Sequence, residues 1–251
     1  MKYKYNNSII LKLGEVIIMD YLVKRTKRKS VSISIDENGV VKVFAPFGVP
    51  NIYIEELIDE NKNWIDENLE NIKRKKMNKK QWTFKEGMTV PFLGKDYNIK
   101  FIIGNFPKNY IRFYENTFQF QLNKKIYDDS FKRIEICKDL LKDFYKKEGN
   151  IYLKRRTKEL EKIIGVKSID IRVKDVKTIW GSCSSKNNIN YNLRLMMMDK
   201  NFIDYVIIHE LCHLLHRNHS KAFWNEVFKY CNDYRKIRND IKEVGFYYNT
   251  L

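Results

Sequence analysis

Apolar and polar residues alternate along much of the first half of the chain. Residues 30–36 (SVSISID) and 40–46 (VVKVFAP) show the period of two that is typical of half-buried strands, and residues 37–39 (ENG) between them predict a hairpin turn. Short strand-like stretches recur at 89–104 and 110–122, the second with the dipeptide EN at a turn. The first half of the chain is therefore expected to be rich in β-structure.

Longer segments carry apolar residues at the spacing of amphipathic helices. These segments are residues 51–76, 131–166, 200–217 and 220–245. The second is predicted to form one long helix or two, ending near Gly165, and the last is predicted to form one helix or a pair. The basic, polar residues that follow the first segment, up to about Gln81, predict a linker or an exposed helix end.

Strand-like segments separate the helices of the second half. Residues 168–176 (SIDIRVKDV) form one of them. Within residues 178–198 the pattern predicts a strand, a turn at KNN, and a longer strand at 189–197 whose polar face includes Asn192 and Arg194. The chain shows no internal sequence repeat, and a β-rich half followed by helices and short strands predicts an α+β fold.

Composition is that of a globular protein with a substantial core, since 43% of the 251 residues are hydrophobic and 14% are aromatic. No apolar run reaches the ~18 residues that a membrane span requires. The first residues, MKYKYNNSII, lack the features of a secretory signal, so we expect a cytoplasmic protein. Cys137, Cys183, Cys212 and Cys231 form no CxxC pair and are expected to be reduced and unpaired, with Cys212 packed in the core.

The net charge of +17 predicts attraction to polyanions. Lysine and arginine gather at residues 24–29, 73–76 and 154–156. Nucleic acid is therefore one candidate partner, bound through the basic surface. The alternative is that the abundance of lysine, asparagine and isoleucine reflects an AT-rich genome.

All four histidines of the chain lie within residues 209–219, HELCHLLHRNH. His209 and His213 are four positions apart on a predicted helix, so both imidazoles lie on one face and can bind one Zn²⁺. Glu210 follows His209 directly, and its carboxylate would lie where it can accept a proton from a metal-bound water. This H-E-x-x-H pattern is typical of zinc hydrolases.

A catalytic zinc needs a third protein ligand and one open position. His216 would lie about 10 Å from His209 along a straight helix, which favours a place at the helix end or in the second shell. His219 follows a predicted turn and precedes a new helix at Ser220, so its side chain can fold back toward the first helix. We therefore predict that His209, His213 and His219 bind the metal.

Four segments of the second half together resemble the YgjP-like metallopeptidase domain. They are WGSCSS (180–185), NLRLMMM (192–198), DYVIIHELCHL (204–214) and NHSKAFW (218–224). In the first half RTKRKSVSISID, VKVFAP and NKNWI have the order and spacing of that family, so the resemblance covers about residues 20–246. The sequence KNN replaces a more usual Lys-Gly-Asn turn, and Asn187 can adopt the conformation that glycine would.

The resemblance implies a zincin with the gluzincin-like minimal core that the SprT and WLM peptidases share. It implies zinc bound by His209, His213 and His219, with Glu210 as the catalytic residue of the HExxH helix. On this basis we expect an N-terminal β-rich subdomain with one helix at residues 1–125 and a zincin-like catalytic subdomain at residues 126–251.

The expected reaction is hydrolysis of a peptide bond by a zinc-activated water, with Glu210 as general base. The strand at 189–197 is expected to pair with an extended peptide substrate. Candidate substrate-binding residues are Arg194, which could contact substrate carbonyls or an oxyanion, and Asn192, Trp180 and Ser182. The segment WGSCSS either shapes a tight turn or lines the cleft.

Two other functions stay open. A metal-dependent nucleotide phosphohydrolase would suit the basic charge, although the chain has no Gly-rich phosphate loop and no carboxylate cluster for Mg²⁺. A nucleic-acid-binding module with a structural zinc would leave Glu210 unexplained, and structural zinc sites usually have four protein ligands and favour cysteine. A combined hypothesis, drawn from the similarity to SprT-type enzymes, is a peptidase that acts on proteins bound to nucleic acid.

Overall fold

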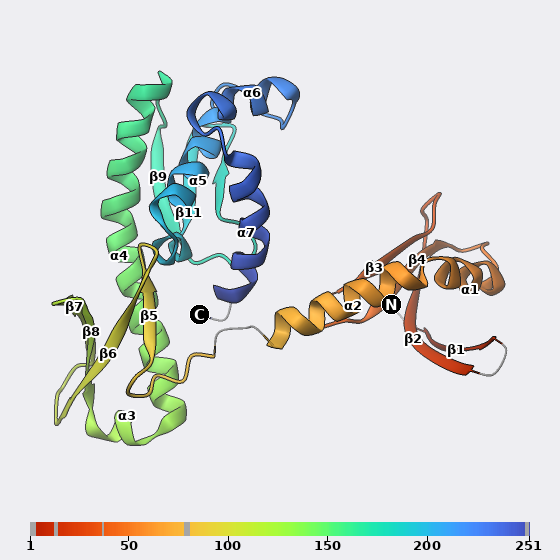
Figure 1. Ribbon diagram of the computed structural model, residues 1–251, viewed down its shortest axis with the longest axis horizontal. Coiled ribbons are helices and arrows are strands. Elements are labelled where there is room, and N and C mark those ends of the chain that lie inside the picture. Colours follow the sequence, from red (N-terminus) through yellow and green to blue (C-terminus); the bar gives the residue numbers. More distant parts are fainter. Residues whose placement is uncertain (1–3, 13–14, 37, 78–80, 249–250) are drawn as a thin grey trace. The chain divides into compact units, whose positions relative to one another are not determined.

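The computed structural model describes the chain except residues 1–3, 13–14, 37, 78–80 and 249–250 (Figure 1). It consists of two compact units, Met1–Lys79 and Lys80–Leu251. This division differs from the expected boundary between residues 125 and 126. The reason is that the apolar core of the second unit is continuous from Trp82 to Leu251, so the strands before residue 125 share a core with the helices after it.

The first unit is a four-stranded sheet with two helices. Its elements are β1 (Lys4–Lys12), β2 (Glu15–Thr26), β3 (Ser32–Ile35), β4 (Val41–Pro46), α1 (Asn51–Glu60) and α2 (Lys62–Met77). The strand order is β1-β2-β4-β3, with β2 and β4 parallel and the other pairs antiparallel. The predicted hairpin of β3 and β4 is confirmed, with Gly39 at φ 86°, whereas the hairpin of β1 and β2 was not predicted.

The core of this unit follows from the alternation of β4 and the helical spacing of α1 and α2. The buried side chains are Tyr21, Val23, Val41, Val43, Ala45, Ile54, Ile58 and Ile65. The single helix predicted at 51–76 is interrupted at Asn61, whose side-chain amide donates to the carbonyl of Leu57 at 2.7 Å. Part of the predicted linker, residues 78–80, lies outside the described residues.

The second unit begins with another four-stranded sheet. Its first elements are β5 (Thr89–Phe92), β6 (Lys95–Gly104), β7 (Tyr110–Tyr114), β8 (Thr117–Asn123), α3 (Lys124–Asp128) and α4 (Ser130–Ile164). The order is β5-β6-β8-β7, again two hairpins joined by a parallel pair, here β6 and β8. The two units therefore share a strand order and a following helix pair, a structural repeat that the sequence did not reveal.

Two predicted helix and turn signals of this part are confirmed. Glu115 and Asn116 form the tight turn of the β7–β8 hairpin with φ values of 48° and 55°. Helix α4 is one uninterrupted helix. It begins where the side chain of Asp129 accepts hydrogen bonds from the first turn, and it ends at Gly165, which has the left-handed conformation at φ 79°.

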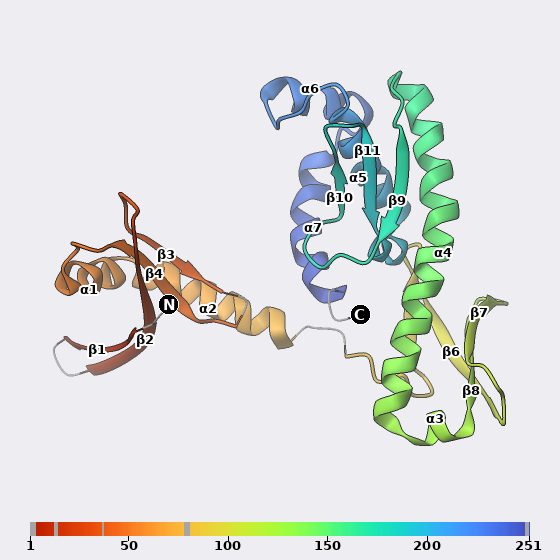
Figure 2. The ribbon, with the colours of Figure 1, turned by 180° about the vertical axis from the view of Figure 1, so that it is seen from behind.

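The remaining elements build the part that carries the histidines. They are β9 (Asp170–Lys174), β10 (Gly181–Cys183), β11 (Asn188–Asn192), the 3₁₀-helix η1 (Leu193–Met197), α5 (Lys200–Cys212), α6 (Lys221–Tyr230) and α7 (Tyr234–Tyr248). The sheet order is β10-β11-β9, with β11 parallel to β9. Helix α4 packs against β9 and α5, and α5 packs against β10 (Figure 2).

The prediction of one long strand at 189–197 is wrong for the second half of that segment. Strand β11 ends at Asn192, whose side-chain oxygen accepts a hydrogen bond from the N–H of Arg194 at 3.0 Å and so caps η1. The side-chain amide of Asn192 donates to the carbonyls of Val176 and Ile179. Residues 193–198 are all buried, so their sequence alternation did not mark an exposed face.

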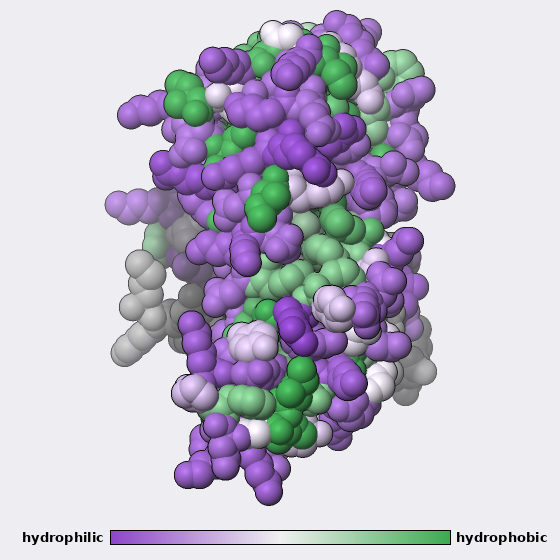
Figure 3. All heavy atoms as spheres, turned by 90° about the vertical axis from the view of Figure 1, so that its left-hand side faces the viewer, coloured by the Kyte–Doolittle hydropathy of each residue, from purple (hydrophilic) through white to green (hydrophobic). Residues whose placement is uncertain are grey.

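On the face drawn in Figure 3, hydrophilic side chains predominate and apolar side chains are exposed in smaller groups. Within the part of the chain that the structure describes, no helix has the length and apolar character needed to cross a membrane.

The β5–β6 turn generates a prediction about stability. Gly94 has φ 79°, and a Cβ atom there would lie 2.7 Å from the Cα of Asp199. Gly87 has a similar φ of 81° but no atom near its Cβ position. We expect Gly87→Ala to lower the free energy of unfolding by about 1–2 kcal/mol through left-handed strain alone. Gly94→Ala should lower the free energy of unfolding by at least about 1 kcal/mol more, because the added methyl group overlaps the backbone of Asp199. Urea unfolding of both variants measures the difference, and equal losses would contradict the role of this contact.

Candidate metal centre

Helix α5 supplies two of the histidines from a buried position. Asp199 begins the helix by accepting a hydrogen bond from the N–H of Phe202 at 2.9 Å. Ile203, Ile207 and Leu211 repeat every four residues and are fully buried, which fixes the face that the helix turns to the core. The histidines at 209 and 213 are therefore held by a helix whose rotation is set by packing.

Helix α5 ends at Cys212, earlier than the predicted end at 217. Tighter turns follow, since the N–H groups of Leu214 and Leu215 bond to carbonyls three residues back. The chain then reverses and enters α6, where Ser220 is the helix cap as predicted, accepting from the N–H of Phe223. His219 stands immediately before this cap and folds back toward α5.

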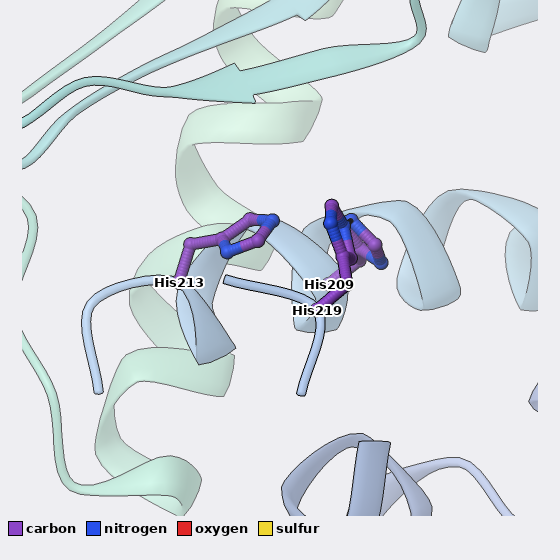
Figure 4. A group of neighbouring side chains, drawn as sticks. All are labelled: His209, His213 and His219. Carbon is purple, nitrogen blue, oxygen red and sulfur yellow. Dashed lines mark hydrogen bonds between the residues drawn. The ribbon is translucent and has the colours of Figure 1, made fainter. Parts of the chain in front are cut away.

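The structure brings together the three histidines predicted as ligands (Figure 4). One side-chain nitrogen from each of His209, His213 and His219 lies within 4.8 Å of the other two. The Nε2 atoms of His209 and His219 face each other at 3.1 Å. Two nitrogens that bind a tetrahedral zinc at about 2.0–2.1 Å lie roughly 3.4 Å apart, so this spacing suits a shared metal ion.

A hydrogen bond to His216 fixes which nitrogen His213 can offer. The Nδ1 atom of His213 lies 3.0 Å from the backbone carbonyl oxygen of His216. Because a carbonyl only accepts, Nδ1 carries the proton and Nε2 keeps its lone pair for a metal. His216 thus contacts the ring of His213 through its backbone carbonyl.

The surroundings of His209 and His213 favour the neutral imidazole, the form that binds a metal ion. Burial lowers the pKa of His209 to about 3, and the neighbouring His213, His219 and Arg238 act in the same direction. Burial also lowers the pKa of His213. Three imidazoles without a carboxylate among them are a donor set that suits zinc, so the residues present fit the metal.

Glu210 lies beside the histidines and is only 5% exposed. Burial raises the pKa of this carboxyl group to about 8 in the metal-free protein. Strand β10 passes directly over it: a Cβ atom at Gly181 would lie 2.7 Å from the Oε1 atom of Glu210. The glycine of WGSCSS therefore makes room for the carboxylate, a role that sequence reasoning missed although glycine inside a strand is a signal of close approach.

The side chains of the four candidate substrate-binding residues contact other groups of the protein. Arg194 is 2% exposed and donates to Asp175 at 2.5 Å and to the carbonyl of Leu251 at 2.6 Å. Asn192 is also buried and caps η1. Both side chains therefore bond to groups inside the fold, because the strand that was predicted to expose them ends at Asn192.

Trp180 and Ser182 lie on β10 or next to it, but their side chains pack onto protein groups. The ring of Trp180 contacts that of Phe202 edge to face at 5.2 Å. The hydroxyl of Ser182 accepts a hydrogen bond from the side-chain amide of Asn190 at 3.3 Å. These contacts favour the shaping role of WGSCSS over direct contact of its side chains with a substrate.

Aromatic side chains from α6 surround the histidines, and sequence reasoning did not single them out. The ring of Phe223 stacks on that of His213 at 4.5 Å, and the ring of Trp224 stacks on that of His219 at 5.6 Å. The guanidinium of Arg238 lies 4.7 Å from the centre of the Trp224 ring. The dipeptide FW, one helical turn after His219, was the available signal.

We expect the protein to bind one Zn²⁺ tightly through the three clustered imidazoles. His219→Ala should weaken Zn²⁺ binding by more than about 100-fold. Loss of a group that only orients a ligand already lowers metal affinity by about 10–100-fold, and this variant removes a ligand itself. His216→Ala is the matched control, since it keeps the backbone carbonyl that bonds to His213. Competition with a chromogenic chelator measures both. Equal affinity of the two variants would contradict this ligand set.

Comparison with known proteins bears on this site. The model of the YgjP-like metallopeptidase domain matches residues 29–244. Among solved structures, the chain is similar to the metallopeptidase zymogen jannalysin of Methanocaldococcus jannaschii, with 28% identity over 36% of this chain and 94% of that one and a TM-score of 0.34. It is also similar to the metallopeptidase zymogen abylysin of Pyrococcus abyssi, with 23% identity over 36% of this chain and 90% of that one and a TM-score of 0.33.

A search of curated proteins returns no significant match. Because the family model covers most of the sequence, the chain belongs to the YgjP-like metallopeptidase family.

Proposed function

We propose that this metallopeptidase hydrolyses peptide bonds with a zinc ion held by His209, His213 and His219 and with Glu210 as general base. The observation that carries the proposal is the cluster of three imidazoles, with a buried carboxylate at the position that follows His209 on the same helix. A bound zinc supplies Lewis-acid polarisation of a carbonyl group and lowers the pKa of water toward 7.

The residues of the chain supply the proton chemistry. Glu210 accepts the proton of the attacking water and then delivers it to the amine that leaves. Its burial under β10 limits the positions that the carboxylate can take, and a cation on the histidines favours its charged form. Gly181 leaves the space that the carboxylate occupies.

Strand β10 is an edge strand of its sheet, whereas β11 is central. The substrate-pairing strand proposed from the sequence, 189–197, therefore has no free edge along β11. The N–H of Asn192 donates to the carbonyl of Trp180, and the N–H of Ser184 donates to the carbonyl of Asn188, both at 2.9 Å. In an antiparallel pair the residues that exchange such bonds alternate with residues that do not.

The alternation leaves the backbone groups of Gly181 and Cys183 pointing to the free edge of β10. An extended peptide that pairs with this edge lies next to Glu210, because Gly181 contacts that carboxylate. Substrate recognition through backbone hydrogen bonds tolerates many side chains. We propose β10, in place of the strand predicted at 189–197, as the strand that binds the peptide.

The basic charge supports one refinement of the substrate. A net charge of +17 attracts polyanions, so proteins bound to nucleic acid are the substrates that we propose. The competing phosphohydrolase and structural-zinc hypotheses gain no comparable support. Among the described residues the metal-ligand cluster consists of histidines alone, without the carboxylates that Mg²⁺ prefers.

Glu210→Gln tests the general base. We expect zinc binding to be retained and peptide hydrolysis to fall by about 100- to 10,000-fold, the usual contribution of a positioned general base. The measurement is hydrolysis of a protein panel, with and without bound DNA, and of nucleoside triphosphates in parallel. Nucleotide turnover without peptide cleavage would instead support a phosphohydrolase.

Gly181→Ala tests the passage of β10 over the carboxylate. The added methyl group overlaps Glu210, so we expect activity to fall by about tenfold or more while zinc affinity stays within about twofold. Gly48→Ala is the control, because a Cβ atom there meets no atom within 4 Å. Full activity of Gly181→Ala would show that the carboxylate does not need this space.

A further inference from the structure

The three histidines differ in how firmly the fold holds them. His209 and His213 stand on or at the end of a buried helix, and Phe223 packs against the rings of all three histidines. His219 is exposed and belongs to the short turn between α5 and α6. A ligand on an exposed turn must be ordered before it can bind, and ordering a residue costs about 1–2 kcal/mol of conformational entropy. The ring of Trp224 stacks on that of His219, and the turn itself needs further contacts to hold it in place.

Arg217 connects this turn to a neighbouring hairpin. Its side chain leaves the turn two residues before His219 and reaches the hairpin of β10 and β11. One guanidinium nitrogen donates to the carbonyl of Ser184 at 2.9 Å and lies 3.8 Å from the sulfur of Cys183. The other donates to the side-chain oxygen of Asn187. A planar guanidinium can serve both acceptors at once, which a lysine ammonium on its flexible stem does less well.

The backbone of the hairpin is shaped to receive this contact. Asn187 has φ 57°, in the left-handed region that asparagine and glycine adopt most readily, and its N–H donates to the carbonyl of Ser184 at 3.0 Å. The turn thereby directs the carbonyl oxygen of Ser184 and the side-chain oxygen of Asn187 toward Arg217. The asparagine that stands in KNN thus adds an acceptor that a glycine at this position would lack.

We propose that Arg217 is a positioning residue that holds His219 in place for the metal by fastening the α5–α6 turn to the β10–β11 hairpin. This inference rests on the proposed function, because it assumes a metal on the three histidines. The same hairpin carries Gly181 and the free edge next to Glu210. One guanidinium therefore connects the third ligand to the strand that is proposed to bind the peptide.

The test measures Zn²⁺ affinity of the full chain by competition with chelators of graded strength. We expect Arg217→Ala to weaken binding by about 10- to 100-fold, as for other groups that orient a metal ligand. Arg217→Lys should recover part of the loss. Asn187→Gly should weaken binding by a smaller factor, because it removes one acceptor and keeps the backbone conformation. Arg172→Ala is the matched control, since it removes an exposed arginine from β9 on the far edge of the same sheet.

A double-mutant cycle separates positioning from general destabilisation. In a His219→Ala background, Arg217→Ala should change Zn²⁺ affinity by no more than about twofold, because the ligand through which it acts is gone. The inference is overturned if the Arg217→Ala variant binds zinc as tightly as the wild type. It is also overturned if Arg217→Ala lowers Zn²⁺ affinity by the same factor in the wild-type and His219→Ala backgrounds. Failure of the wild type to bind zinc would instead reject the proposed metal site.

Discussion

The close passage of β10 over α5 is the constraint on which the site depends. A helix that is buried on most of its surface can keep a carboxylate beside its histidines only if the neighbouring strand leaves space for it. Gly181 provides that space, because any larger residue would overlap the Oε1 atom of Glu210. The same contact brings the free edge of the three-stranded sheet next to the carboxylate. Burial of the acid and the access that we propose for an extended peptide thus follow from one packing contact.

The proposed metal ligands come from two kinds of structure. Two histidines take their positions from a helix that the core fixes, and the third takes its position from a turn. The turn is fixed by polar contacts, since Ser220 caps α6, Asn218 accepts from the N–H of Ser220, and Arg217 reaches the β10–β11 hairpin. Polar contacts at an exposed position are individually weak, so several of them act together.

The two units are built on the same strand order, although each has its own apolar core. In each unit, two hairpins join through a parallel pair of their second strands, and two helices follow. In the second unit the second of these helices is α4, which continues as the support of the three-stranded sheet and of α5. The additional elements after α4 carry the histidines, so the candidate site lies in an extension of the repeated unit.

The sequence alone determined the features that depend on local spacing. Histidines four residues apart on one helix, a turn and a cap at Ser220, the hairpin of β3 and β4 and the end of α4 at Gly165 all follow from contacts between near neighbours in the chain. The family and the α+β class followed from such local motifs, and the histidine cluster is as expected from them.

Only the tertiary structure decided which alternating segment was exposed and which strand had a free edge. Residues 193–197 alternate like a strand, yet they form a 3₁₀-helix that is buried on all sides, and Arg194 pairs with Asp175 inside the fold. The place of Gly181 against Glu210, the reach of Arg217 and the boundary near residue 79 likewise depend on segments far apart in sequence. Alternation reports a difference between two faces, and it loses that meaning where packing buries both.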